Sequence, residues 1–305
     1  MLLVEQALNG LQYGVMLFLM AAGLTLVFGI MNLINLAHGS LYMVGAFVCA
    51  ATFAASRSWL LALLAGVVAA LITGVVIEIS IFRALYRRDH LHQVLATFGL
   101  TLFFNEAVHV IWGANGLYAE VPGFLAGHVR VLPGVSYPAY RLAIILVGLA
   151  AALALDLLVR RTRLGMLIRG GAADRAMIAA LGVNIRLLFT VVFALGAALA
   201  GLSGLLAGPI FNVESGMGDN VVIVAFVVIV IGGVGSVRGA LAGAVLVGLV
   251  DTLGRAFLRP LLGLMLRPSA ADSAGPALAS MLIYVLMAAV LFWRPQGLLP
   301  PRGRA

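Results

Sequence analysis

Lysine is absent from this 305-residue sequence, cysteine occurs once, and only 10% of the residues are charged. Hydrophobic residues, by contrast, make up 63% of the chain and occur in long runs. A soluble domain cannot bury so much apolar surface in one core, so a large part of it must face lipid. Membrane barrels use alternating segments of about 10 residues, which these runs do not resemble. The composition therefore predicts an all-α, polytopic transmembrane helical bundle without an intrachain disulfide.

Signatures of catalysis and of metal binding are also missing. The sequence has no HExxH, no Gly-x-Ser-x-Gly, no Cys/His metal spacing and no phosphate-binding loop ending in Lys-Ser/Thr. We therefore expect no catalytic site, no metal and no cofactor in this chain, so that separate chains would have to do any nucleotide-driven work. The net charge of +8 comes entirely from arginines, which cluster beside the apolar runs. Arginines in such places face anionic lipid headgroups, which predicts contact with membrane lipid and no nucleic acid.

Helical runs of roughly 20 residues are needed to cross the hydrocarbon core of a membrane. Several boundaries between apolar runs carry little or no charge, and so do not fix where one span ends and the next begins. We therefore expect eight or nine membrane segments, some of them discontinuous or re-entrant. Short arginine-rich loops stay in the cytoplasm, which places 83–91, 160–186 and the C-terminal tail there and the N-terminus outside. The predicted segments are 7–30, 37–56, 59–82, 92–112, 142–160, 187–208, 221–237, 239–258 and 277–293.

The loop 160–186 is longer than topology alone requires, and it has a helical pattern. We expect Gly170-Gly171 to interrupt that pattern and Gly182 to close a helix as a left-handed C-cap. Two short helices with small side chains on one face are suited to docking into a groove of another protein. The alternative to docking is that the segment is only a solvated basic loop. The residues that form the helical pattern are Leu164, Leu167 and Ile168 before the two glycines and Ala172, Ala176, Ala179 and Ala180 after them.

Two stretches predict irregular backbone at membrane depth, which occurs only against protein or a water-filled cavity. In 29–40, the side chains of Asn32, Asn35 and His38 are three residues apart and would share one ridge of a helix. Either this segment is a discontinuous helix whose polar groups face a pathway, or it is a short loop with Asn caps. In 232–239, four glycines would cost a helix about 1 kcal/mol each. They form either a tight cytoplasmic turn or a backbone segment that opens into a cavity.

Four blocks of sequence, in this order and separation, resemble the permease subunits of branched-chain amino-acid ABC importers. They are INLAHGSLYMVGAF at 34–47, RTRLGMLIRGGAADRAMIAALGVN at 161–184, GGVGSVRGALAG at 232–243 and RPQGLL at 294–299. The intervening 95–116 fits as well, and the resemblance covers nearly the whole chain. It is closer to the shorter of the two permease types, because a long N-terminal extension is missing. Related permeases carry urea, short amides or other amino acids, so the substrate stays open.

This resemblance implies that 1–305 is a single transmembrane permease domain in a bacterial inner membrane. It further implies a second homologous permease subunit, two cytoplasmic ATPase subunits and a periplasmic solute-binding protein as partners. The loop 160–186 then corresponds to the cytoplasmic coupling loop, which transmits ATPase movement to the membrane spans. The ATPase-coupling residues predicted on this basis are Arg163, Gly165, Arg169, Asp174, Ala179 and Gly182, together with Ala176 on the small-residue face.

The two irregular stretches contain our candidates for the translocation pathway. Asn35, His38, Gly39, Gly232, Gly233, Gly235 and Ser236 match motif positions of the family, and Asn32 joins them because of its spacing. A role of these residues in substrate passage is our inference. Two other classes remain in view: a proton- or ion-coupled secondary transporter of a small polar solute, which would have inverted repeats and charged midplane residues, and a channel.

Overall fold

The computed structural model describes residues 2–86, 88–133, 135–264 and 267–300 and is almost entirely helical. Its long helices confirm the predicted all-α bundle. A π-helical turn, Glu78–Phe82, extends α3, and a short 3-10 turn, Gly123–Leu125, precedes the two strands. The helices are α1 (Leu2–Met31), α2 (His38–Ser56), α3 (Trp59–Ile77), α4 (Arg83–Leu85), α5 (His90–Trp112), α6 (Ala139–Arg161), α7 (Arg163–Ala173), α8 (Arg175–Ala180), α9 (Ile185–Ala207), α10 (Met217–Gly232), α11 (Val237–Leu262) and α12 (Pro268–Trp293).

Within the described residues, eight helical segments are long and apolar enough to cross a membrane, with α3 continuing through its π-helical turn to Leu85. The remaining predicted segment, 221–237, corresponds to α10, which is a shorter apolar helix of 16 residues. At 1.5 Å per residue, α10 is about 24 Å long and falls short of the roughly 30 Å hydrocarbon core. The difference between eight and nine predicted segments therefore comes from one helix, α10, which is too short to cross the membrane.

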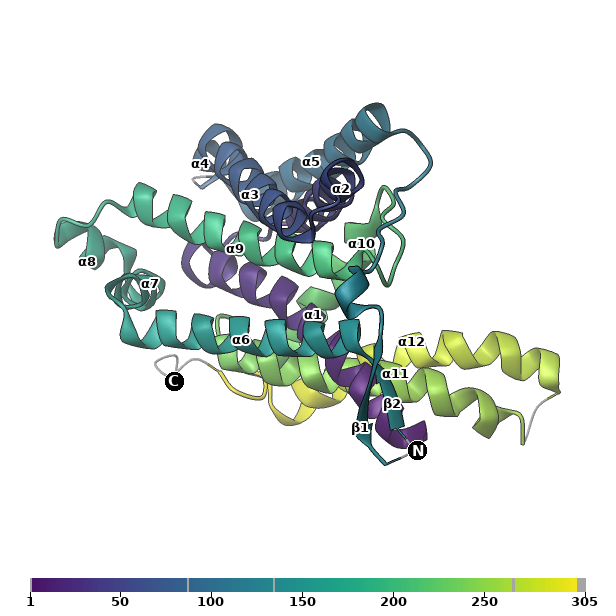
Figure 1. Cartoon of the computed structure of the whole chain (residues 1–305). Helices are drawn as coiled ribbons and strands as arrows, with labels where there is room; N and C mark the ends of the chain where they lie inside the picture. The colour runs from purple at the N-terminus through teal and green to yellow at the C-terminus, as the bar shows by residue number, and fades with distance from the viewer. Residues whose placement is uncertain (1, 87, 134, 265–266, 301–305) are drawn as a thin grey trace.

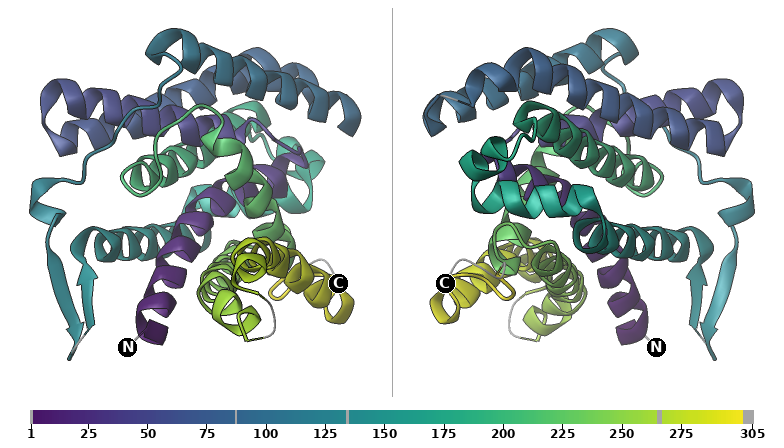
Figure 2. Two further views of the ribbon diagram at one scale, coloured as in Figure 1. Left: turned by 90° about the vertical axis from the view of Figure 1, so that its right-hand side faces the viewer. Right: turned by 90° about the vertical axis from the view of Figure 1, so that its left-hand side faces the viewer.

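The helix α1 forms the centre of the bundle. It is apolar on all sides, and 89% of its most hydrophobic window is buried, as expected of a helix surrounded by others. Figures 1 and 2 show α2, α3 and α5 on one side of it and α11 and α12 on the other. The helices α6 and α9 lie alongside α1 in the middle layer.

Glycines allow the backbones of neighbouring helices to approach closely, as in many membrane proteins. A Cβ atom built on Gly23 of α1 would lie 2.6 Å from the carbonyl oxygen of Gly196 in α9, and one on Gly45 of α2 would lie 2.5 Å from the Cα of Gly201. Gly99 in α5 makes no such contact with the described residues. A Cβ on Gly99 would meet no atom within 4 Å, because this part of α5 faces outward.

The two ends of the bundle carry different elements. In Figure 1, α7 and α8 lie toward the left, whereas the start of α1 lies toward the right beside the two strands. These strands, β1 (His128–Leu132) and β2 (Val135–Pro138), form an antiparallel hairpin within the connection 113–138. The hairpin is anchored to α1, because the side chains of Tyr137 and Arg141 both donate hydrogen bonds to Asn9.

Candidate functional site

The basic loop 160–186 folds into α7 and α8, as expected, but the two helices separate at a different residue. The predicted interruption at Gly170-Gly171 is wrong, since α7 continues through both glycines to Ala173. The chain breaks at Asp174, whose Oδ1 accepts hydrogen bonds from the backbone N–H groups of Ala176 (2.9 Å) and Met177 (3.0 Å). A carboxylate at this N-cap position starts a new helix. The buried Gly171 instead lets α7 pack against the bundle.

Four of the seven predicted coupling residues build this pair of helices. Gly165 allows the first turn of α7 to contact the carbonyl oxygen of Val159, and Arg169 donates a hydrogen bond to the same oxygen. Asp174 caps α8. Gly182 has φ +85° and donates its backbone N–H to the carbonyl of Ala179 at 3.0 Å, so it adopts the predicted left-handed conformation. The side chains of the other three, Arg163, Ala176 and Ala179, are exposed.

Large apolar side chains also project from this region, a feature that the sequence analysis missed. Met177 is 57% exposed, Leu181 72% and Leu187 61%. The cationic group of Arg175 stacks over the ring of Phe189 at 5.7 Å and so ties α8 to the first turns of α9. Burial lowers the pKa of the Arg175 guanidinium below its usual value. We call α7, α8 and the connection to Leu187 the basic knob.

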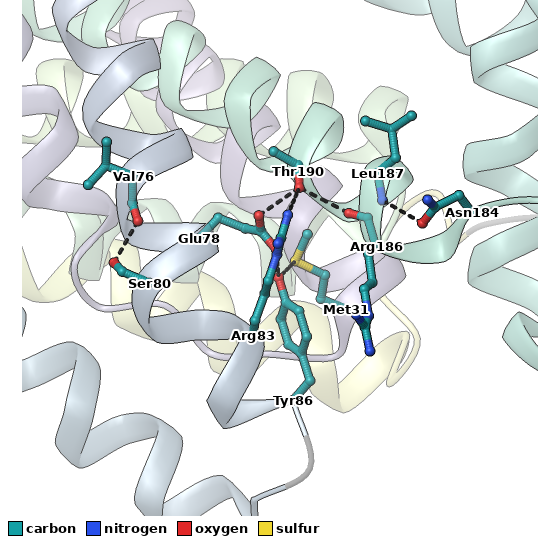
Figure 3. A network of polar contacts seen from close by, with 10 residues as sticks. All are labelled: Met31, Val76, Glu78, Ser80, Arg83, Tyr86, Asn184, Arg186, Leu187 and Thr190. Atoms are coloured by element: carbon teal, nitrogen blue, oxygen red, sulfur yellow. Dashed lines mark hydrogen bonds and ion pairs between the residues drawn. The ribbon is translucent and has the colours of Figure 1, made fainter.

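A buried carboxyl group lies at the base of α9, next to the basic knob. Glu78, in the π-helical turn, is 0% exposed, and Figure 3 shows its carboxylate between three partners. The hydroxyl of Tyr86 donates to Oε1 at 2.8 Å, the hydroxyl of Thr190 donates to Oε2 at 2.7 Å, and the guanidinium of Arg83 lies 3.5 Å from Oε1. Arg83 also donates to Thr190 at 3.2 Å. This network joins the end of α3 to the start of α9.

The Glu78 network touches two further elements. The hydroxyl of Tyr86 lies 3.8 Å from the sulfur of Met31, the last residue of α1, and Thr190 Oγ1 lies 3.0 Å from the carbonyl oxygen of Arg186. Burial and the hydrogen bond to Glu78 raise the pKa of the Tyr86 hydroxyl. Because Arg186 lies within the basic knob, displacement of the knob would reach α1 and α3 through these contacts.

The predicted break after α1 exists, and it brings buried polar groups into the bundle. Residues 32–37 are not helical, and α2 begins at His38. Asn35 is 0% exposed and His38 is 1% exposed, whereas Asn32 is exposed and has φ +51°. The shared ridge of three polar side chains therefore does not form, because the segment is not a helix. A Cβ on Gly23 would lie 2.8 Å from Nε2 of His38, so the imidazole packs directly on the backbone of α1.

Several of these polar atoms have no hydrogen-bond partner among the described residues. They are Thr25 Oγ1, both amide atoms of Asn35, both ring nitrogens of His38 and Ser40 Oγ. Buried polar atoms without partners cost a few kcal/mol each, so such a cluster is suited to water or a polar solute. Gly39 begins the adjoining contact with α10, since a Cβ there would lie 2.5 Å from the carbonyl oxygen of Gly218.

The glycine-rich stretch 232–239 forms a tight turn between α10 and α11. Gly233 and Gly235 have φ values of +104° and +85°, and Ser236 caps α11 by accepting from the N–H of Gly239 at 3.0 Å. The tail covers this turn, because the N–H of Leu299 donates to the carbonyl oxygen of Gly232 at 3.0 Å. The contact joins the third and fourth sequence blocks.

Together these features define a multi-pass helical membrane protein with a folded basic knob and a polar break in its core. The family described as "Branched-chain amino acid transport system / permease component" matches residues 6–291. The chain belongs to this family of transport permeases.

Curated relatives agree with this assignment. The chain is 31% identical over 270 residues to the high-affinity branched-chain amino acid transport system permease protein LivH of Salmonella typhimurium, with 84% of this chain and 87% of the relative covered. It is 30% identical over 310 residues to the permease protein BraD of Pseudomonas aeruginosa, covering 97% and 95%. A probable LivH of Methanocaldococcus jannaschii is 24% identical over 256 residues, covering 79% and 78%. None of the solved structures matches this chain significantly.

Proposed function

We propose that this chain is the membrane permease of an ATP-driven importer of branched-chain amino acids in a bacterial inner membrane. The observation that carries the proposal is the basic knob, a folded segment with exposed apolar side chains in a member of this permease family. A knob of this kind suits a groove on a partner, since short helices dock through exposed apolar anchors. The partners are a second homologous permease, two ATPases on the cytoplasmic side and a periplasmic solute-binding protein.

The mechanism follows from the contacts of the knob. ATP binding and hydrolysis occur in the ATPase chains, which push or release α8. The ring of Phe189 and the Glu78 network transmit this displacement to α9, α3 and the end of α1. Those helices meet at glycines, where small rigid-body shifts change a close backbone contact. The polar break at Asn35 and His38 follows α1, one of these helices, and forms part of the translocation pathway. Gly233 and Gly235 have a different role, because they form the turn that holds α10 and α11 together.

The competing function is a self-sufficient secondary transporter of a small polar solute. It would not need a folded knob with apolar side chains exposed to the cytoplasm, and the family assignment speaks against it. The substrate class follows from the family description and from the names of its relatives.

Site-directed crosslinking in the assembled complex tests the proposal. Ala176→Cys, in a Cys49→Ala background, is expected to form a crosslink with an ATPase subunit in intact cells. Tyr118→Cys is the matched control, because Tyr118 is 82% exposed on the connection at the opposite end of the bundle. Crosslinks from position 118 to the ATPase, or none from position 176, would refute the docking role of the knob.

A further inference from the structure

A cavity of about 380 Å³ lies between α1, α10, α11 and α12, away from the basic knob and from the break after α1. Its volume lies at the low end of the range for small-molecule sites, roughly 300–1,000 Å³. The polar part of its wall includes Tyr13, Asp251, Arg255 and Ser280. The apolar part includes the branched side chains of Val224 and Val247 with their neighbours.

An ion pair lies inside this cavity. Arg255 Nε donates to Asp251 Oδ2 at 2.9 Å, and Arg255 Nη2 donates to Ser280 Oγ at 3.4 Å. Only 12% of the Asp251 side chain is exposed, compared with 53% of the Arg255 side chain. The two residues are four positions apart on one helix, and Asp251 lies in the cavity wall, near the middle of the 26-residue α11.

The position of the pair calls for a functional explanation. Asp251 lies about 17 Å along α11 from the end of the helix at Leu262, well inside a segment long and apolar enough to cross a membrane. Ionisable side chains within such helices are costly and usually mark substrate pathways. The packing of α11 on α1 does not need them, because it is formed by small residues such as Gly248 against Gly14.

The wall complements an α-amino acid in charge and in shape. A guanidinium has five N–H donors, and the two contacts above occupy only Nε and Nη2, so Arg255 keeps donors for a carboxylate. Asp251 Oδ1 stays available as an acceptor for an ammonium group. The valines at 224 and 247 supply the apolar surface for an aliphatic side chain.

We propose that this cavity is a binding site for a zwitterionic α-amino acid with a branched aliphatic side chain. The ammonium group binds Asp251, the carboxylate binds Arg255, and the side chain packs on Val224 and Val247. The site gives the permease its own selection step for the solute. The proposal rests on the proposed function, because it deepens the substrate class of the same importer.

The test uses the whole importer in vesicles of phosphatidylcholine alone. D251N and R255Q should each lower ATP-driven leucine uptake at least tenfold, and the charge swap D251R/R255D should not restore it, because the charges would then face the wrong ends of the solute. D272N is the matched control and should retain uptake within twofold. Asp272 forms another Arg–Asp ion pair with α11, to Arg259 at 2.6 Å, but both side chains are mostly exposed and lie outside the cavity wall. Wild-type uptake by the swapped variant would mean that the pair is structural only, and would overturn the proposal.

A second readout is independent of transport. Ile223 is 50% exposed at the cavity, so I223C in a Cys49→Ala background can be labelled with a thiol reagent. Leucine should slow the labelling at least fivefold, whereas isoamylamine, which lacks the carboxylate, and 4-methylpentanoate, which lacks the ammonium group, should not. Equal protection by all three compounds, or protection only by added phosphatidylethanolamine, would refute an amino-acid site. If the wild-type importer transports leucine while these results fail, only the site is refuted. A wild-type importer without uptake refutes the proposed function itself.

Discussion

Replacing Gly182 with valine changes the backbone of the basic knob without adding a steric clash. Gly182 has φ +85°, and a Cβ atom built on it would meet nothing within 4 Å. The cost of the substitution is therefore conformational, and for an L-residue in the left-handed region it is roughly 1–2 kcal/mol. A penalty of this size changes a two-state population by a factor of about 5 to 30. The connection from α8 to α9 should then leave its observed conformation in most molecules.

The assay is the ratio of leucine imported to ATP hydrolysed by the importer in proteoliposomes. G182V is expected to lower this ratio at least fivefold while ATP hydrolysis continues, because the knob no longer holds the geometry that transmits movement. G182N is the matched control and should keep most of the coupling, since asparagine tolerates the left-handed region. An unchanged ratio in G182V would refute the role of the α8 C-cap. An equal loss in G182N would show that the side chain, rather than φ, is responsible.

Three further substitutions test other parts of the structure. G204A should lower the thermal midpoint of the purified protein, because its Cβ would overlap the carbonyl oxygen of Tyr42 and overpacking costs about 1–3 kcal/mol. An unchanged midpoint would contradict the observed contact of α2 with α9. Y86F should destabilise the protein by about 1–3 kcal/mol in denaturant melts, because Oε1 of the buried Glu78 loses its hydroxyl donor and keeps only the Arg83 guanidinium at 3.5 Å; wild-type stability would mean that water replaces the hydroxyl at no cost. H38A should slow leucine uptake without affecting copurification of the ATPase, and wild-type uptake would leave the imidazole with a purely structural role.

A glycine outside the helix contacts provides the control for G204A. G99A should leave the thermal midpoint unchanged or raise it slightly, because a Cβ at Gly99 meets nothing within 4 Å and alanine favours helix by about 1 kcal/mol over glycine. A fall as large as that in G204A would indicate that any added methyl group destabilises the bundle.

Local signals in the sequence predicted the helices and several of their ends. Hydrophobic runs identify membrane helices because a span must satisfy its own backbone hydrogen bonds. The left-handed conformation of Gly182 followed from its place at the end of a helical pattern, and the structure confirms it. Interruption at Gly170-Gly171 was a reasonable expectation from propensity alone. Tertiary packing of α7 overrides it, and the capping carboxylate of Asp174 decides where the helix ends.

Spacing along the sequence did not predict the contacts between distant segments. Thr190 lies 112 positions from Glu78, and nothing local to either residue indicates that they are partners. Gly99 and Gly204 are alike in sequence context, yet only Gly204 faces another backbone. The i,i+4 spacing of Asp251 and Arg255 favours an ion pair, but the cavity around it depends on four helices. The pathway residues proposed from motifs remain predictions.

The most direct measurement of the central claim is leucine uptake by proteoliposomes that contain this permease with its proposed partners. Uptake should require both the ATPase subunits and ATP, and a non-hydrolysable ATP analogue should abolish it. Uptake that continues without the ATPases, or that follows an imposed proton or sodium gradient instead, would contradict an ATP-driven importer.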